Sequence, residues 1–191
     1  MKFSLLTVTF LLIGCNEYSI KNKVEKTEPP ISPKVITTIP EGAVNANFLG
    51  AQDSIYAYVK EVDMRSEKTT IAFQNNKLPK ISIPESVGAE LQILKLKKFN
   101  KDLLLVNAKL KDTNFNEYYL YFWNDTAWTQ PVNRFAIHKS NMSDTLVPIQ
   151  TNPNDSTQLL RYYSVFDMDR NSAQKYSWRL LSESLPIENS D

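Results

Sequence analysis

Cysteine, histidine and glycine are scarce in this chain, and their scarcity excludes several kinds of site. The 191 residues include one cysteine, Cys15, one histidine, His138, and four glycines. A secreted domain that relies on disulfides carries an even set of cysteines, so no internal disulfide is expected. Zinc sites built from several cysteines or histidines are excluded in the same way. The scarcity of these residues therefore predicts no metal. The usual phosphate-binding and dinucleotide-binding loops need clustered glycines, so we also predict no cofactor.

The single histidine also limits catalysis. A serine–histidine–acid triad would have to use His138, and no serine has the flanking glycines of a nucleophile elbow. We expect the His138 side chain to point outward from the end of a strand. A carboxylate pair that hydrolyses glycosides is recognised by its separation in space, and nothing in the sequence points to one. We therefore predict no catalytic residue.

An excess of charge of one sign is missing as well. Lysine and arginine total 22, and aspartate and glutamate total 21. Nucleic acids and anionic membrane surfaces are bound by clustered positive charge, so we predict no nucleic-acid partner. The short, interrupted cluster of Lys95, Lys97, Lys98 and Lys101 is expected to be a solvated strand edge or turn.

The first fifteen residues have the layout of a secretory signal. Lys2 supplies the positive charge, residues 5–13 form a mainly apolar stretch, and Gly14 is the small residue before Cys15. The apolar stretch is too short to cross a bilayer, which takes about 20 residues in a helix. The run Leu12-Ile13-Gly14-Cys15 resembles the lipobox of bacterial lipoproteins.

This resemblance implies a lipid anchor. It implies that a diacylglyceryl group is attached to the Cys15 thiol and that the signal peptide, residues 1–14, is then removed by the lipoprotein signal peptidase. Acyl chains such as palmitate contribute about 0.8 kcal/mol per buried methylene, and two or more chains hold a protein stably at a membrane. Asn16 follows the cysteine, whereas aspartate in that place resembles the inner-membrane retention signal of enteric bacteria. The outer membrane of the cell envelope is therefore favoured.

The composition changes along the mature chain. Residues 15–38 comprise the lipidated cysteine and a tether rich in charges and prolines, which cannot bury enough surface to offset the entropy of ordering. Residues 39–187 have strand-like patterns over a length that suits one domain. Residues 188–191 form a short tail. We expect a disordered tether that leads into a single folded domain.

The strand-like patterns predict an antiparallel β domain. Alternation of apolar and polar residues indicates strands at 54–62, 69–74, 80–83, 90–96, 103–110, 117–123, 127–132, 135–138, 145–149, 158–167 and 175–181. No segment has sustained helical periodicity beyond a turn near 84–87. A parallel sheet would need crossover helices, for which there is no room. We predict a mostly β chain folded as a sandwich, a barrel or a curved sheet.

Aromatic side chains are the most suggestive feature of the domain. Tyr119, Tyr121 and Trp123 share one face of a predicted strand. A two-residue turn at Asn124-Asp125 would pair Trp123 with Thr126 and bring Trp128 opposite Tyr121. Such a group forms either a platform on which a glycan stacks or, as we expect, part of a core strand that is apolar on both faces.

A second aromatic set invites the same interpretation. We expect it to be core as well, and it consists of Tyr162, Tyr163, Phe166, Tyr176 and Trp178. Between the tyrosines and phenylalanine of the first strand and the aromatic residues of the second, residues 167–171 have oxygen-bearing side chains at the first, third and fifth positions, as a calcium loop does. The later positions do not fit, because Ser172 stands where such a loop requires glycine and Trp178 stands where it requires glutamate. We interpret this segment as a hairpin turn.

Together these patterns favour a non-catalytic, lipid-anchored β domain. We expect an interaction or accessory protein of the cell envelope that contacts the membrane through its lipid and binds a protein partner. A carbohydrate-binding surface lipoprotein that uses the face around Tyr121 and Trp128 is one alternative. A hydrolase with a carboxylate pair is another.

Replacing Cys15 by serine is expected to abolish membrane retention without preventing folding, because the change removes no core residue and no cross-link. Labelling with radioactive palmitate and membrane fractionation test this. The unmodified protein should incorporate label and sediment with membranes, and the Cys15→Ser protein should do neither. Absence of label from the unmodified protein would contradict the lipid anchor.

Overall fold

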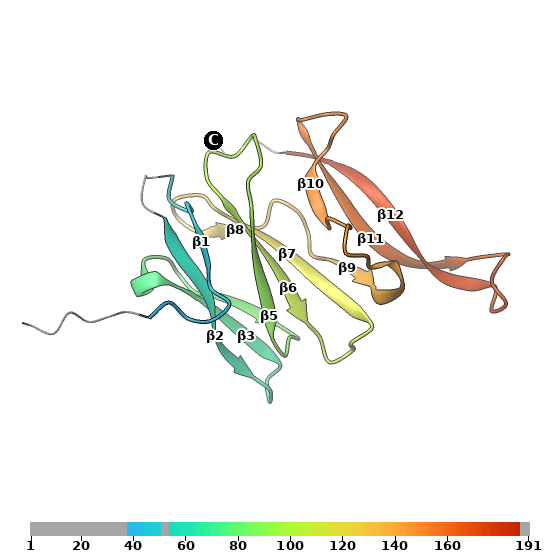
Figure 1. The fold of residues 1–191 in the computed structure, drawn as a ribbon, viewed down its shortest axis with the longest axis horizontal. Coiled ribbons are helices and arrows are strands. Elements are labelled where there is room, and N and C mark those ends of the chain that lie inside the picture. The colour runs from blue at the N-terminus through green and yellow to red at the C-terminus, as the bar shows by residue number, and fades with distance from the viewer. Residues whose placement is uncertain (1–37, 51–53, 188–191) are drawn as a thin grey trace, which may run out of the picture. The chain divides into compact units, whose positions relative to one another are not determined.

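The computed structural model describes residues 38–50 and 54–187 (Figure 1). The predicted signal peptide, Cys15, the tether up to residue 37 and the tail at 188–191 lie outside the described residues. Among the helical segments of the described part, none combines the length and the hydrophobicity that crossing a membrane requires.

The described part is mostly β and forms three antiparallel sheets. Its strands are β1 (Val44–Ala46), β2 (Ile55–Asp63), β3 (Lys68–Phe73), β4 (Ile81–Pro84), β5 (Ala89–Leu94), β6 (Leu103–Lys109), β7 (Phe115–Trp123), β8 (Trp128–Thr129), β9 (Phe135–His138), β10 (Ile149–Thr151), β11 (Gln158–Met168) and β12 (Tyr176–Pro186). The first sheet has the order β1-β2-β3-β4, and the third has the order β10-β11-β12. The central sheet has the order β5-β6-β7-β8, and β9 pairs with the other end of β7.

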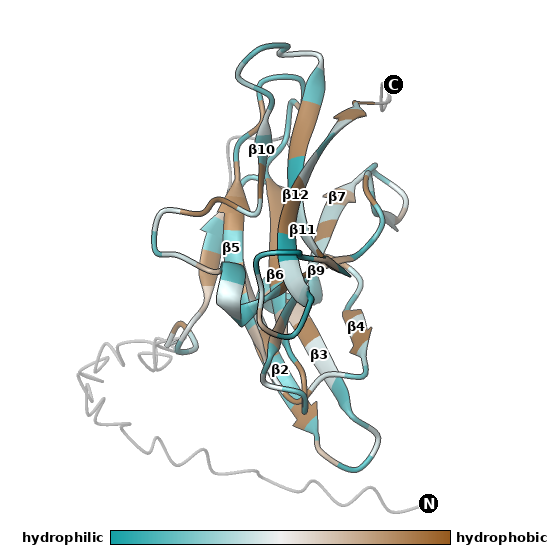
Figure 2. Cartoon of the chain, turned by 90° about the vertical axis from the view of Figure 1, so that its right-hand side faces the viewer, coloured by the Kyte–Doolittle hydropathy of each residue, from teal (hydrophilic) through white to brown (hydrophobic). Residues whose placement is uncertain are grey.

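The central sheet is buried on both faces, because β6 and β7 carry apolar side chains at successive positions. In β7, Tyr119 and Tyr121 point into one core while Leu120 and Phe122 point into another. Successive side chains of a strand point to opposite faces, so a continuous apolar run serves two cores. Figure 2 shows hydrophobic stretches within the strands, interrupted by hydrophilic ones, and the hydrophilic colour in many of the connecting loops.

Each core lies between the central sheet and one outer sheet. The first core joins Leu104 and Val106 of β6 to residues of β1 to β4 such as Ile55 and Ile71. The second core joins Leu103 and Leu105 of β6 to Ile149 of β10 and Leu159 of β11. The result is a sandwich of three layers, which confirms the prediction of an antiparallel β domain.

Several predicted strand bounds need correction. The strand at 135–138 has the predicted bounds, whereas β1 was not predicted at all. The strand expected at 127–132 ends at Thr129, because Pro131 offers no backbone donor to continue the ladder. The strand expected at 145–149 instead begins at Ile149, directly after Pro148.

The helical turn expected near 84–87 is absent from the described residues. Glu85 has φ 55°, a left-handed value that a right-handed helix does not use. The described 3₁₀ segments lie elsewhere, at η1 (Gln74–Asn76), in which Asn75 and Asn76 also have left-handed φ values, and at η2 (Lys139–Asn141).

The turn after β7 is longer than predicted. Trp123 pairs with Trp128 rather than with Thr126, so the loop has four residues, 124–127. Asn124 closes this loop, because its side-chain Oδ1 accepts hydrogen bonds from the backbone N–H groups of Thr126 (3.1 Å) and Ala127 (2.8 Å). The pairing is shifted by two residues, which leaves Trp128 on the expected face.

Lys101 departs from the expected solvated lysine cluster. Lys95, Lys97 and Lys98 are exposed, but Lys101 is 7% exposed. Its Nζ lies 2.5 Å from Oδ1 of Asp125 and 3.4 Å from the Trp123 carbonyl oxygen. A buried ammonium group needs such partners. The last residue of β7 supplies the carbonyl oxygen, and the turn after β7 supplies the Asp125 carboxylate.

Burial changes the ionisation of the core tyrosines. Desolvation, with a smaller contribution from the neighbouring Tyr119, raises the pKa of Tyr121 from 10.0 to about 12. Desolvation also raises the pKa values of Tyr118 and Tyr119. The folded protein therefore holds these phenolic protons more tightly than the unfolded chain does.

Replacing Tyr121 by phenylalanine is expected to reduce the loss of stability at alkaline pH. The stabilisation from this raised pKa is complete below pH 10.0 and is lost as the pH rises through about 12. The free energy of unfolding, measured by urea denaturation between these pH values, should fall less steeply in the Tyr121→Phe protein. Equal slopes for the two proteins would contradict the burial of this hydroxyl.

Candidate functional site

The first aromatic group lies in the core rather than on the surface. Tyr119, Tyr121 and Trp123 are 4%, 6% and 7% exposed. Trp128 is half-buried, stacks on Phe73 with ring centroids 4.8 Å apart, and donates a hydrogen bond from Nε1 to the Pro79 carbonyl oxygen. Because the rings of these residues are packed against protein, they offer no open platform to a glycan.

The second aromatic group behaves differently, and here the expectation of core packing is wrong for two members. Phe166 is 61% exposed and Tyr176 is 47% exposed, whereas Tyr162 and Tyr163 are half-buried against the second core. Met168 is 56% exposed beside them. We call the group of Phe166, Met168, Tyr176 and Trp178 the hairpin patch.

Strand pairing places the four side chains of the hairpin patch on one face. In the ladder between β11 and β12, Phe166 is opposite Trp178 and Met168 is opposite Tyr176. Residues directly opposite each other, and residues two apart on one strand, share a face of the sheet. The Phe166 ring stacks on Tyr176 with centroids 5.6 Å apart and lies 5.2 Å from Trp178.

The inner end of the hairpin patch is fixed to the central sheet. The Trp178 ring stacks on His138 of β9 with centroids 5.0 Å apart and meets the edge of Phe115 of β7 at 4.9 Å. Ser164 of β11 accepts a hydrogen bond at Oγ from the backbone N–H of His138, 2.9 Å away. Beyond this support the hairpin continues towards its turn, as Figure 1 shows for the end of β11 and β12.

Residues 167–171, which resemble the start of a calcium loop, lie where β11 ends and the turn of the hairpin begins. The pairing of β11 with β12 confirms the prediction that this segment forms a hairpin turn. Asp169 stabilises the turn, because its Oδ1 accepts from the Asn171 N–H at 3.0 Å and its Oδ2 accepts from the Ser177 hydroxyl at 3.1 Å. Asp167 pairs with Arg179 at 2.6 Å. Both carboxylates thus have partners within the hairpin.

A shallow hollow lies at the same end of the hairpin. It has a volume of about 310 Å³ and is lined by Met168, Arg170, Lys175 and Tyr176. Arg170 and Lys175 are exposed. Apolar side chains are therefore flanked by cationic ones.

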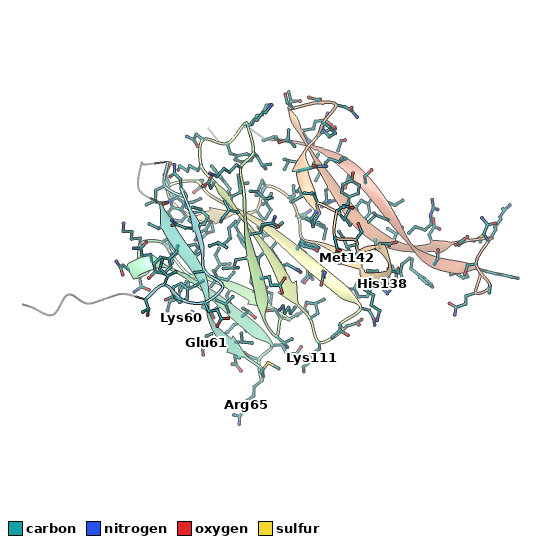
Figure 3. All side chains as sticks on the ribbon, viewed as in Figure 1. Lys60, Glu61, Arg65, Lys111, His138 and Met142 are labelled. Atoms are coloured by element: carbon teal, nitrogen blue, oxygen red, sulfur yellow. The ribbon has the colours of Figure 1, made fainter. Side chains whose placement is uncertain are left out.

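His138 is positioned as a structural residue. Its Nδ1 accepts a hydrogen bond from the Ser140 N–H at 3.2 Å, and this bond caps the 3₁₀ turn η2. The same Nδ1 lies 2.8 Å from the Ser140 Oγ. Figure 3 shows His138 beside β11. Among the described residues, no hydrogen bond or ion pair joins His138 to a carboxylate, as an acid–base triad would require.

Two carboxylates converge on Arg134 at the surface. Its Nη1 lies 3.2 Å from Glu85 and 3.5 Å from Glu117, and it donates to the Tyr119 hydroxyl at 3.3 Å. These contacts, the Tyr119 hydrogen bond first, raise the pKa of Arg134 above its ordinary value. The Arg134 guanidinium thus links Glu85 to Glu117 of β7 at the surface of the domain.

Sequence reasoning missed the hairpin patch because exposed and buried aromatic residues have the same pattern along a strand. The two strands of the hairpin have eleven residues each, whereas β6 has seven, β7 has nine and β9 has four. The sequence pattern indicated only residues 175–181 for the second strand, so it gave no sign of this extra length.

Comparisons with known proteins give no relative from which a function could be transferred. No family model matches the chain, and no curated protein or solved structure matches it. Function is inferred from the geometry of the described residues.

Proposed function

We propose that this chain is a lipid-anchored protein of the bacterial cell envelope that binds a protein partner through the hairpin patch, without catalysing a reaction. The exposure of Phe166, Met168 and Tyr176 together at one end of the domain carries this proposal. Elsewhere in the described part the exposed large apolar residues are Ile39, Val62, Met64 and Val147.

The composition of the hairpin patch is typical of a protein interface. Tyrosine, tryptophan, phenylalanine, methionine and arginine are enriched at such interfaces, and tryptophan, tyrosine and arginine contribute most to binding energy. Met168, Tyr176 and Trp178 are of these kinds, and Arg170 lines the adjacent hollow. An exposed apolar group with a polar rim marks an interaction site rather than an ordinary surface.

The patch is also preorganised at its inner end. The contacts of Trp178 with His138 and Phe115 hold one side of the patch in place before a partner arrives. Less side-chain entropy is then lost on binding, which favours affinity.

The anchor in this proposal is lipidated Cys15, and it rests on the lipobox resemblance. A two-chain lipid would hold the domain at the membrane, with the outer membrane favoured. The proline-rich segment between Cys15 and the β domain would give the hairpin patch reach towards a partner in the envelope, at about 3.1 Å per residue where it is extended.

Site-specific photocrosslinking in living cells tests the proposal. We expect p-benzoylphenylalanine in place of Tyr176 to give a discrete protein adduct, because a bound partner would lie against this ring. The same amino acid in place of Met64, which is 60% exposed in the turn between β2 and β3, is the matched control and should give no such adduct. Adducts are detected by immunoblotting and identified by mass spectrometry.

A second substitution links the adduct to the patch. Phe166→Asp should reduce the Tyr176 adduct at least fivefold while changing the free energy of unfolding by about 1 kcal/mol or less, because Phe166 is exposed. No adduct at Tyr176, or adducts of equal yield at Met64, would contradict the proposal. A protease-resistant adduct at Tyr176 that glycosidases remove would also contradict it, because the hairpin patch would then bind a glycan instead of a protein.

A further inference from the structure

One sheet edge in the described part is long and open. β12 forms one edge of the sheet β10-β11-β12 and has eleven residues. The other edges are shorter, with three residues in β1, four in β4, six in β5, two in β8, four in β9 and three in β10. In Figure 1, β12 lies at the rim of its sheet with no further strand beyond it.

The pairing with β11 determines which backbone groups of β12 face the open edge. The Ile187 N–H donates to the Thr157 carbonyl oxygen at 3.1 Å, and the Asp169 N–H donates to the Lys175 carbonyl oxygen at 2.8 Å. Hydrogen-bonded and non-hydrogen-bonded pairs alternate along an antiparallel ladder, so the odd-numbered residues of β12 bond to β11. The N–H and C=O groups of Trp178, Leu180, Ser182 and Ser184 therefore point away from β11. No strand of the described part pairs with this side of β12.

This edge lacks most of the features that usually prevent strand addition. Proteins protect open edges with bulges, with prolines, with charged side chains, lysine above all, or by keeping the edge short. The charged residues of β12 are Arg179 and Glu183. The β11–β12 ladder has no break in its register, and β12 contains no lysine and no proline before Pro186. An edge of this length and regularity is suited to pair with another strand.

We propose that β12 pairs antiparallel with β12 of a second copy of this chain, about a twofold axis at Leu181. In such a pairing, residues whose backbone N–H and C=O groups point to the open edge must lie opposite each other. A twofold axis at Leu181 therefore places Leu180 opposite Ser182 of the partner and Trp178 opposite Ser184 of the partner. Leu181 then lies opposite its own symmetry mate. The three-stranded sheet would continue into the sheet of the second copy.

Charge complementarity favours this register. With the axis at Leu181, Arg179 of each copy lies opposite Glu183 of the other, which places two ion pairs across the interface. An axis at Arg179 or at Glu183 would instead bring two like charges into direct opposition, which is destabilising. The side chains are accessible for the new contacts, with Arg179 52% and Glu183 43% exposed.

Each of these side chains also has a partner within its own protomer. Arg179 contacts Asp167, and Glu183 contacts Arg161. Guanidinium has five N–H donors and carboxylate has two acceptor oxygens, so each group can hold one partner within the protomer and one across the interface. These contacts within the protomer orient Arg179 and Glu183 on one face of β12 before a second copy binds.

Cysteine cross-linking of the full chain tests both the dimer and its register. The test uses the Cys15→Ser background, which removes the only other thiol. Residues opposite each other in a non-hydrogen-bonded pair have Cα atoms about 4.5 Å apart, which suits a disulfide. Leu181→Cys should therefore give a disulfide-linked dimer under mild oxidation. Arg179→Cys and Glu183→Cys should each form no disulfide-linked dimer alone, and should form one when the two variants are mixed.

A backbone variant tests the pairing without a thiol. Ser182→Pro removes an N–H that points to the open edge, so the bonds between β11 and β12 remain. We expect sedimentation equilibrium to show a dimer for the unmodified chain and a Kd at least tenfold weaker for Ser182→Pro, with Ser182→Ala as the control. A monomeric unmodified chain whose Leu181→Cys variant does not cross-link would overturn the proposal, and so would equal cross-linking of Arg179→Cys alone and of the mixture.

Discussion

The alternating side chains of β7 are the constraint on which the rest of the structure depends. Tyr119 and Tyr121 fill the first core, and Leu120 and Phe122 fill the second. A slip of one residue in the pairing between β6 and β7 would exchange these two sets and spoil both cores together. The central sheet is therefore fixed in register by two independent packing surfaces, and the outer sheets take their positions from it.

The third sheet is supported less evenly than the first. Leu159 and Ile149 hold its inner part against the second core, and Trp178 rests on His138 and Phe115 further out. Past these contacts, within residues 38–50 and 54–187, β11 and β12 are supported only by each other. This arrangement leaves two surfaces uncovered on one hairpin, the hairpin patch at its turn and the open edge of β12. Binding surfaces placed on an element that a rigid frame holds at its base combine accessibility with preorganisation.

The two uncovered surfaces have different chemistry and need not share a partner. The patch offers aromatic side chains and flanking cations, whereas the edge offers backbone donors and acceptors. If both are used, a dimer would present two hairpin patches, and binding to a repetitive or clustered partner would gain from multivalency.

Sequence reasoning reached the features that depend on local pattern. The apolar run of β7 indicated a central strand buried on both faces, and the strand at 135–138 has the expected bounds. It did not predict the features that depend on which other strands or turns pack against a residue. Phe166 and Tyr121 are both aromatic residues in strands, and they differ only because one has a sheet packed over it and the other does not. Lys101 is another case, since its partner Asp125 lies in a turn that is two residues longer than the sequence predicted.

Amide hydrogen exchange of the whole chain tests most directly whether β6 and β7 form the frame. The account predicts that the amides of these two strands exchange last, and that the amides of β11 and β12 near their turn exchange faster by orders of magnitude, because only the hairpin itself protects them. If the amides of β7 exchanged as fast as those near the turn, the central strand would not be the element that holds the two cores together.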